Sequence, residues 1–410
     1  MKEHFSPFWN GFMGRFSVLV LIPGIALFTL PASAVAAEFR HPGILNDHAG
    51  LETTRRSLMA GDAEKLRMLS DMKASPLSAL NYHPSPVAAV VCGPHSKPDI
   101  GCKAEVRDAQ AAYTQALLWI YERDNRRARN AIRIMDAWSA TLTGGHQGSN
   151  APLQAAWAAQ LWTRAAEIIR YSGSGWLEKD SRYFGGWLLA QYLPDIDRMG
   201  ACMNGNWQAS AIDARMSIGV YTDRRDIYQR AVADWNAQLP AYIYLRSDGA
   251  IPRQMPGCGR PVRQAWYGQK VFKSGMVQEM CRDLRHTAFG LAAYLNAAET
   301  DRIQGGTLYA SGRERLGAAL EFVTEYGSGQ QVPAWLCGGK LKSNLDGTLE
   351  IGFAQLHGRM GLPMPNTQRW LRDEAPSAGT KHFLWESMTH GSEVRAARSR
   401  VVENNDSVED

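Results

Sequence analysis

The chain has 410 residues, of which 45% are hydrophobic, 10% aromatic and 21% charged. This composition is that of a globular protein with a sizeable core, and it excludes a disordered or collagen-like chain. The formal net charge of +5 comes from 45 Lys and Arg against 40 Asp and Glu. Because no basic run accompanies this small surplus, nucleic acid is not an expected partner, whereas arginines gathered in a cleft would suit an anionic small molecule or polymer.

Residues 1–37 are organised like a secretory signal. A weakly basic start precedes an apolar run over residues 16–30, and small residues suited to cleavage follow at 34–37. A membrane anchor is the alternative, but the run is shorter than the ~20 residues that a spanning helix needs, and a Pro-Gly pair interrupts it. We therefore expect a mature protein that begins near Glu38, is periplasmic or secreted, and has no membrane contact after cleavage.

Nearly every long segment of the mature region has helical periodicity. Within 104–121, apolar residues recur at steps of three and four, which places them on one helix face, and 153–170 repeats the pattern from Trp157 onward. Strand-like alternation is nowhere sustained. The predicted helices span residues 52–74, 104–121, 127–142, 153–170, 183–193, 208–220, 225–245, 276–298, 312–325 and 349–360.

The loops between these helices are rich in Gly, Asn, His and aromatic residues. About ten helices joined by such loops predict an all-α fold of helical hairpins curved into an (α/α) toroid, as an incomplete barrel, or into a solenoid, with loops that build a groove on one face. The absence of a fixed repeat period disfavours a regular tetratricopeptide-type array. We expect one domain over residues 38–392 and a polar, disordered tail at 393–410.

Six cysteines lie in the mature region. In an oxidising compartment disulfides are the expected state, but the connectivity stays open, and only the pair Cys92 and Cys102 suggests itself locally. Zinc is the alternative. It is disfavoured because no two cysteines stand two to four residues apart, as a zinc knuckle requires.

The loop at residues 200–208 ends where a helix begins. Asn206 is placed to cap that helix, and a helix start presents free N–H groups that attract carboxylates. A cap explains one asparagine only. Because Asn204, Trp207 and Gln208 stand beside it, we expect this loop to take part in function.

The predicted helix at 276–298 carries a polar cluster. Acidic, basic and cationic side chains would converge there beside a glycine, whose missing side chain would leave room for a ligand. The alternative interpretation is a solvated helix face with an ion pair. By steps of three and four residues, one face holds Glu279, Arg282, Asp283, His286 and Gly290.

A third cluster lies on the Gly- and Pro-rich loop over residues 248–267. Guanidinium groups hold carboxylates and aromatic rings stack on sugar faces, so this composition suits an anionic sugar. A structural loop held by Cys258 is the alternative. The residues concerned are Arg253, Arg260, Arg263, Trp266 and Tyr267.

Short motifs along most of the mature chain carry a resemblance to a known family. They are His41–Leu45, Gly93–Gly101, Asp108–Leu117, Asn150–Trp157, Asn204–Gln208 and Arg282–Thr287. In this order and spacing the chain resembles the alginate-lyase-domain polysaccharide lyases, of the types called families five and thirty-eight. The resemblance fades near Pro365.

The resemblance implies an (α/α) toroid and a polysaccharide lyase that cleaves a 1,4-linked polyuronate, alginate (mannuronan) or glucuronan. The implied chemistry is β-elimination, which leaves 4,5-unsaturated uronate ends and needs neither metal nor cofactor. It requires that the carboxylate be neutralised, the C5 proton removed and the leaving oxygen protonated. The expected partner is an anionic polysaccharide, and the expected oligomeric state is a monomer.

The resemblance also implies roles for four catalytic residues. Asn206 matches the asparagine that binds the substrate carboxyl group. Arg260 and Tyr267 match an arginine and a tyrosine that follow an Asp-Gly-x-x-Pro turn, the tyrosine being the usual acid and sometimes also the base. His286 matches a neutral histidine that assists as base or as carboxyl neutraliser.

Five further residues are expected to bind substrate, and two positions depart from the family pattern. Alginate-specific relatives often place a histidine directly after the catalytic asparagine, where this chain has Trp207. Some relatives carry a tyrosine where this chain has Phe353. The expected substrate-binding residues are Asn150, Gln154, Trp207, Arg263 and Arg282.

Two other functions stay open on the sequence alone. An (α/α)-barrel glycoside hydrolase acting on uronides would need two carboxylic acids that face each other across the cleaved bond, and no such pair stands out. A non-catalytic polyuronate-binding protein would keep the arginines and aromatic residues and lack the base.

Overall fold

A computed structural model describes residues 11, 38–345, 349–374, 379–380 and 383–391. By its contacts the chain divides into two units, Met1–Glu38 and Phe39–Asp410, and the second unit holds all the described helices and strands. Apart from Gly11, the predicted signal at 1–37 lies outside the described residues, as does the predicted tail at 393–410.

Most of the second unit is helical. The helices are α1 (His48–Met59), α2 (Ala63–Ala74), α3 (Cys102–Glu122), α4 (Asn125–Thr141), α5 (Ala151–Arg170), α6 (Glu178–Gln191), α7 (Leu193–Asp197), α8 (Gly205–Tyr221), α9 (Arg225–Tyr242), α10 (Val262–Ala265), α11 (Leu284–Ile303), α12 (Leu308–Gly327), α13 (Leu349–Phe353), α14 (Pro365–Glu374) and α15 (Glu386–His390).

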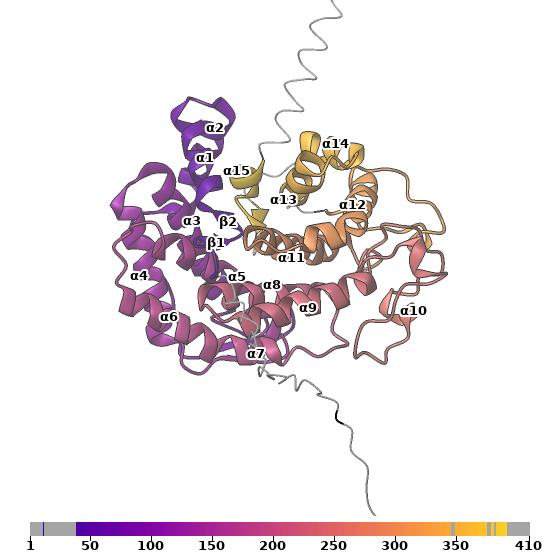
Figure 1. Cartoon of the computed structure of the whole chain (residues 1–410), viewed down its shortest axis with the longest axis horizontal. Coiled ribbons are helices and arrows are strands. Elements are labelled where there is room, and N and C mark those ends of the chain that lie inside the picture. Colours follow the sequence, from indigo (N-terminus) through magenta and orange to yellow (C-terminus); the bar gives the residue numbers. More distant parts are fainter. Residues whose placement is uncertain (1–10, 12–37, 346–348, 375–378, 381–382, 392–410) are drawn as a thin grey trace, which may run out of the picture. The chain divides into compact units, whose positions relative to one another are not determined.

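Burial divides these helices into two layers. The inner helices α5, α8 and α11 are buried on almost every face, which suits their many small residues, and α3 is buried along most of its length. In the inner layer α3 contacts α5, α5 contacts α8, and α8 contacts α11. The outer helices α4, α9 and α12 pack against α3, α8 and α11 respectively. Figure 1 shows α8 and α11 side by side. Helical hairpins in two layers form an (α/α) toroid, as the sequence predicted.

Several predicted helix boundaries are wrong. The helix expected at 52–74 is two helices, α1 and α2, separated at Gly61, whose φ of 83° is readily adopted only by a residue without a side chain. The helix expected at 276–298 begins at Leu284, because Asp283 caps it. The helix expected at 349–360 changes after α13 into a π-helical segment, Ala354–Arg359, and α14 was not predicted.

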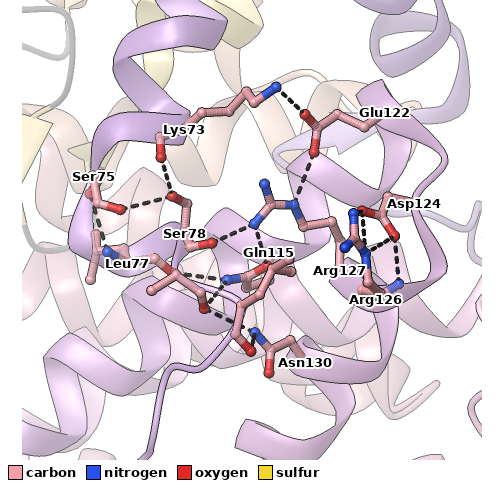
Figure 2. Close-up of polar contacts among 12 residues, drawn as sticks. Lys73, Ser75, Leu77, Ser78, Gln115, Glu122, Asp124, Arg126, Arg127 and Asn130 are labelled. Carbon is pink, nitrogen blue, oxygen red and sulfur yellow. Dashed lines mark hydrogen bonds and ion pairs between the residues drawn. The ribbon is translucent and has the colours of Figure 1, made fainter.

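A polar network attaches the segment after α2 to α3 and α4 (Figure 2). Arg127 of α4 donates to Glu122 at 2.9 Å and to the carbonyl oxygen of Ser78, and Gln115 of α3 donates to the carbonyl oxygens of Leu77 and Ala79. These bonds satisfy loop carbonyl groups that would otherwise be buried without partners. They hold the segment that follows α2 against α3 and α4.

The strands are two or three residues long and lie in the segments before or between helices. They are β1 (Gly43–Ile44), β2 (Asn46–Asp47), β3 (Val90–Cys92), β4 (Asp99–Ile100), β5 (His146–Gln147), β6 (Gly379–Thr380) and β7 (Phe383–Leu384). The strand β3 pairs with β4 antiparallel and with β5 parallel, so a small sheet anchors the loop that precedes α3.

All six cysteines form disulfides. The pairs are Cys92–Cys102, Cys202–Cys258 and Cys281–Cys337. The first is the pair predicted from the sequence. The other two join residues 56 positions apart and tie the loops before α8 and α11 to later loops.

Candidate active site

Two asparagines stand at the start of helix α8. Asn204 is the N-cap residue and Gly205 the first helical residue. The prediction that Asn206 caps this helix is therefore wrong, because Asn206 lies inside the first turn, where it is completely buried. A side chain at Gly205 has no space, since a Cβ there would lie 2.1 Å from the Tyr242 ring. The glycine lets α8 start in close contact with Tyr242.

Side chains from the loop before α11 bind the first turn of α8. The backbone N–H of Gly205 donates to Gln278 at 2.9 Å, and that of Asn206 donates to Glu279 at 2.7 Å. Asn206 Nδ2 also donates to both carboxylate oxygens of Glu279, at 2.8 and 2.7 Å. Among the described residues, the buried Oδ1 of Asn206 has no hydrogen-bond partner. The asparagine therefore has an acceptor atom available to a ligand.

Glu279 connects Asn206 to a cationic side chain. Its Oε1 accepts a hydrogen bond from Arg282 at 3.1 Å, and the positive charge of Arg282 also acts on Tyr267. Burial raises the pKa of Glu279, while hydrogen bonds from Asn206 and the charge of Arg282 oppose the shift. Burial and the charge of Glu279 raise the pKa of Tyr267, against the charges of Arg282 and Arg260. The phenol group therefore keeps its proton at neutral pH.

Asp283 caps α11 and orients a histidine. Its Oδ1 accepts from the backbone N–H of His286 at 2.8 Å, and Nδ1 of the His286 ring lies 2.7 and 2.8 Å from its two carboxylate oxygens. Burial alone would raise the pKa of Asp283, but the bonds and charge of His286 lower it. Because the helix starts only at Leu284, the predicted shared face is wrong: Glu279 and Arg282 reach the site from the preceding loop.

Gly290 does not leave room for a ligand, contrary to the sequence-based expectation. A Cβ there would lie 2.0 Å from the hydroxyl oxygen of Tyr242, which donates to the carbonyl oxygen of Thr287 at 3.4 Å. Gly205 and Gly290 thus both serve the close packing of helices around Tyr242.

A cavity of about 300 Å³ lies where α5, α8 and α11 begin, beside the loop at residues 94–96. Polar groups that converge with aromatic rings in one cavity are typical of a ligand site. Five predicted site residues line it: Asn150, Asn206, Trp207, Arg282 and His286. The other lining residues are Pro94, His95, Ser96, Leu153, Trp157 and Phe289.

Two other predicted residues, Gln154 and Tyr267, lie outside the cavity lining. Gln154 is buried and donates to the carbonyl oxygen of Cys102 at 2.9 Å and to Glu105 at 2.7 Å. Tyr267 is 41% exposed, and its pKa responds to the charge of Arg282, which does line the cavity.

The two predicted arginines of the 248–267 loop also lie outside the cavity lining. Arg260 donates to the carbonyl oxygen of Cys202 at 2.7 Å, so it ties its own loop to the loop that precedes α8. The side chain of Arg263 is exposed on the short helix α10. Arg260 lies two positions and Arg263 five positions after the disulfide-bonded Cys258, which supports their loop.

Four residues of this site were not predicted from the sequence. Glu279 was grouped with its neighbours but was not assigned to the site, and Trp157 was assigned to an apolar helix face. His95 and Phe289 were not singled out. A histidine that follows Gly-Pro between two cysteines was the available signal for His95. Phe353, the departure noted above, is buried and stacked on His357 at 4.6 Å.

No group of three or more His, Cys, Asp or Glu side chains within the described residues could hold a metal ion. Within the same ranges, no helix has the length and hydropathy needed to cross a membrane. The three disulfides are typical of proteins from oxidising compartments.

The helical toroid, with a cavity that holds asparagine, arginine, histidine and aromatic side chains at its helix starts, defines the class as a polysaccharide lyase. Residues 102–333 match the family model described as Alginate lyase, which is more than half of the chain. The chain belongs to the alginate lyase family.

Two solved structures share the fold. An alginate lyase from Bacteroides ovatus has 14% sequence identity and a TM-score of 0.51, over 72% of this chain and 88% of that one. The alginate lyase A1-III, in a His-to-Ala variant complexed with a tetrasaccharide, has 15% identity and a TM-score of 0.53, over 78% of this chain and 90% of that one. No curated protein matches the sequence.

Proposed function

We propose that this protein is exported and cleaves a 1,4-linked polyuronate, alginate or glucuronan, by β-elimination without a metal. The observation that carries the proposal is the convergence of Asn206, Arg282 and His286 in one cavity, with Tyr267 close enough to feel the charge of Arg282. Family membership and the tetrasaccharide complex of the A1-III lyase support a polysaccharide as the substrate. The disulfides and the N-terminal signal sequence support export.

The reaction consists of one elimination. A base removes the C5 proton of the uronate, and the electron pair of that C–H bond forms the C4–C5 double bond. The bond between C4 and the bridging oxygen breaks, and an acid protonates that oxygen. The C5 proton is acidic enough only when the charge of the adjacent carboxylate is neutralised, so cationic and hydrogen-bonding groups must surround the carboxyl group.

The described residues supply each of these groups. Arg282 provides the positive charge that neutralises the carboxylate, and Oδ1 of Asn206 is the acceptor atom that the amide presents to a ligand in the same cavity. Asp283 holds Nδ1 of His286, so the imidazole is oriented to act as the base through its other ring nitrogen. Tyr267, whose pKa is raised, keeps the proton that it donates to the leaving oxygen.

The carboxyl groups of the site do not favour a hydrolase. A hydrolase needs one carboxyl group to act as acid and a second to act as base or nucleophile. Here Glu279 is buried under Asn206 and Arg282, and Asp283 is bound to His286. Each carboxylate supports another side chain of the site, which suits a lyase better.

The ultraviolet absorbance of a conjugated uronate tests the proposal. The purified mature protein should raise this absorbance on poly-mannuronate, poly-guluronate or glucuronan incubated separately, and the substrate that reacts fastest identifies the preferred uronate. New reducing ends without a rise in absorbance would establish a hydrolase instead. Tight binding without either product would establish a binding protein.

Tyr267→Phe tests the acid. It keeps the ring and removes the proton donor, so turnover should fall by about 10² or more while substrate binding persists. Tyr183→Phe is the matched control, because Tyr183 is also an exposed tyrosine (59%) and lies outside the cavity lining. If Tyr267→Phe keeps near-full activity while His286→Ala is inactive, then the assignment of Tyr267 is wrong and His286 acts alone.

A further inference from the structure

The loop between Cys92 and Cys102 carries His95 to the cavity. His95 and Ser96 both line it, and both have positive φ angles, 52° and 53°. Residues other than glycine adopt this conformation at a cost, and they keep it only where the surroundings impose it. The cost at two successive residues indicates that the loop holds its side chains in a defined place.

The surroundings of His95 account for this conformation. The disulfide joins the two ends of the loop, and the pairing of β3 with β4 continues from it. Inside the loop the backbone N–H of Gly93 donates to the carbonyl oxygen of Pro98 at 3.1 Å, and that of Ser96 donates back to Gly93 at 3.0 Å. The loop is therefore a rigid wall of the cavity.

The His95 ring has no support of its own. The side chain is exposed, and within the described ranges no hydrogen bond, ion pair or ring contact involves it. The ring of His286 differs, since Asp283 holds its Nδ1. A general base is normally oriented by a second group, whereas a substrate-binding side chain needs only a fixed backbone and a ring that can donate or accept.

We propose that His95 is a substrate-binding residue that hydrogen-bonds a carboxylate of the polyuronate chain, at a sugar next to the one held by Asn206 and Arg282. This inference rests on the proposed function, because only a polyuronate presents a carboxylate on every sugar. Trp207 follows Asn206 in this chain, and His95 supplies to the cavity a second imidazole beside that of His286, from a loop much earlier in the sequence. It acts in binding and substrate choice and transfers no proton.

Two variants at this position separate the side chain from the loop. His95→Asn is the informative one, because asparagine tolerates positive φ better than most residues and so preserves the loop while it withdraws the ring. His95→Ala removes the polar group altogether. His83→Ala is the matched control, since His83 is an exposed histidine that does not line the cavity.

The readouts are steady-state kinetics and calorimetric binding of a tetrauronate. Both His95 variants should raise KM and the tetrauronate Kd about tenfold, as expected for one lost charge-assisted hydrogen bond, with kcat within twofold of the wild type and an unchanged melting temperature. A carboxyl-reduced tetrasaccharide should bind the wild type and the variants equally. His83→Ala should behave as wild type on both ligands.

Three results would overturn this inference. The first is a wild-type KM and Kd in both variants. The second is a fall in kcat at constant KM, which would mean proton transfer. The third is an equal loss of affinity for the carboxyl-reduced ligand. If the wild type produces no unsaturated ends but binds tetrauronate, the proposed function fails while the binding arm still decides the role of His95. If it binds no uronate, both proposals fail.

Discussion

Asn206 and Glu279 form a buried pair in which one carboxylate accepts three hydrogen bonds from one asparagine. The backbone N–H of Asn206 donates to one carboxylate oxygen of Glu279, and Nδ2 donates to both, at 2.7 to 2.8 Å. Neither residue has any exposed surface. This arrangement fixes the amide of Asn206 so that its oxygen is the atom left for a ligand.

Glu279→Gln should therefore impair catalysis without abolishing the fold. Glutamine has the same shape, but its NH₂ group cannot accept the bonds from Asn206 that end on Oε2 of Glu279, and it carries no charge to pair with Arg282. We expect kcat to fall about 10- to 100-fold, less than the loss in Asn206→Ala, which removes the amide that faces the substrate and should cost about 10² to 10³. Steady-state kinetics with circular dichroism as a folding control measure both. A Glu279→Gln enzyme with full activity would contradict the positioning role.

Asp283→Asn tests the orientation of His286. Asparagine can still cap α11 through its side-chain oxygen, but it cannot stabilise a protonated imidazole as a carboxylate does. We expect kcat to fall at least tenfold, and the acidic limb of the pH–activity profile to move to lower pH, because the imidazolium loses its carboxylate partner. His286→Ala should be inactive at all pH values. An unshifted profile in Asp283→Asn would mean that His286 is not the base.

The sequence predicted the layers of the fold better than the site. Steps of three and four in apolar residues depend on local geometry alone, so α3, α4 and α5 were placed within two residues of their true ends. The start of α11 was missed, because residues 276–283 have helix-like spacing but are held as a loop by the Cys281–Cys337 disulfide and by the Asp283 cap. The disulfide belongs to the tertiary structure and the cap depends on a single side chain, so the spacing of apolar residues reveals neither.

The site residues likewise divide into those found in local sequence motifs and those placed by the tertiary structure. Asn206, Arg282 and His286 stood in motifs that could be recognised, and the fold brings them to one cavity. His95 lies more than 100 positions before Asn206 in the sequence, so its place could not be inferred without the toroid. Glu279 was visible as an acid near Arg282, but its bonds to Asn206 depend on how the loop before α11 meets the start of α8.

The Cys281–Cys337 disulfide should contribute to both stability and activity. Closing a loop of 56 residues stabilises a protein by about 4 kcal/mol in the chain-entropy model. Cys281 directly precedes Arg282, so the Cys281→Ser, Cys337→Ser double variant should also raise KM. Urea unfolding and kinetics measure the two effects. Intact-mass analysis with and without reductant should first find three disulfides in the exported protein, and free thiols there would contradict the pairing.

Salt should weaken substrate binding. The range of electrostatic attraction shortens from about 10 Å at 0.1 M to about 3 Å at 1 M salt. Because Arg282 lines the cavity and Arg263 is exposed on α10, we expect KM for a polyuronate to rise several-fold over this range while kcat changes little. Arg263→Gln should make the rise smaller. A KM that is independent of salt would contradict recognition of the polyanion by arginines.

Buried charges behind the cavity predict how stability depends on pH. His146 is buried with Nε2 2.9 Å from Glu105 and Nδ1 3.0 Å from Asp195, and Glu105 also accepts from Gln154 and Tyr192. Burial by itself would lower the pKa of His146, but the charge of Glu105 and the hydrogen bonds to both carboxylates raise it to about 9.

Because the folded-state pKa of His146 exceeds its unfolded value of about 6.5, the protonated histidine stabilises the fold fully below pH 6.5. That contribution is lost as the pH rises from 6.5 through 9, and it amounts to at most about 3 kcal/mol. Urea unfolding of the wild type at pH 6 and pH 9 should show the loss, and His146→Gln should show a smaller dependence on pH, with His83→Gln as the control. In the wild type, the His146 ring should titrate near pH 9 by NMR; a midpoint near 6.5 would show that the two carboxylates do not hold a charged histidine.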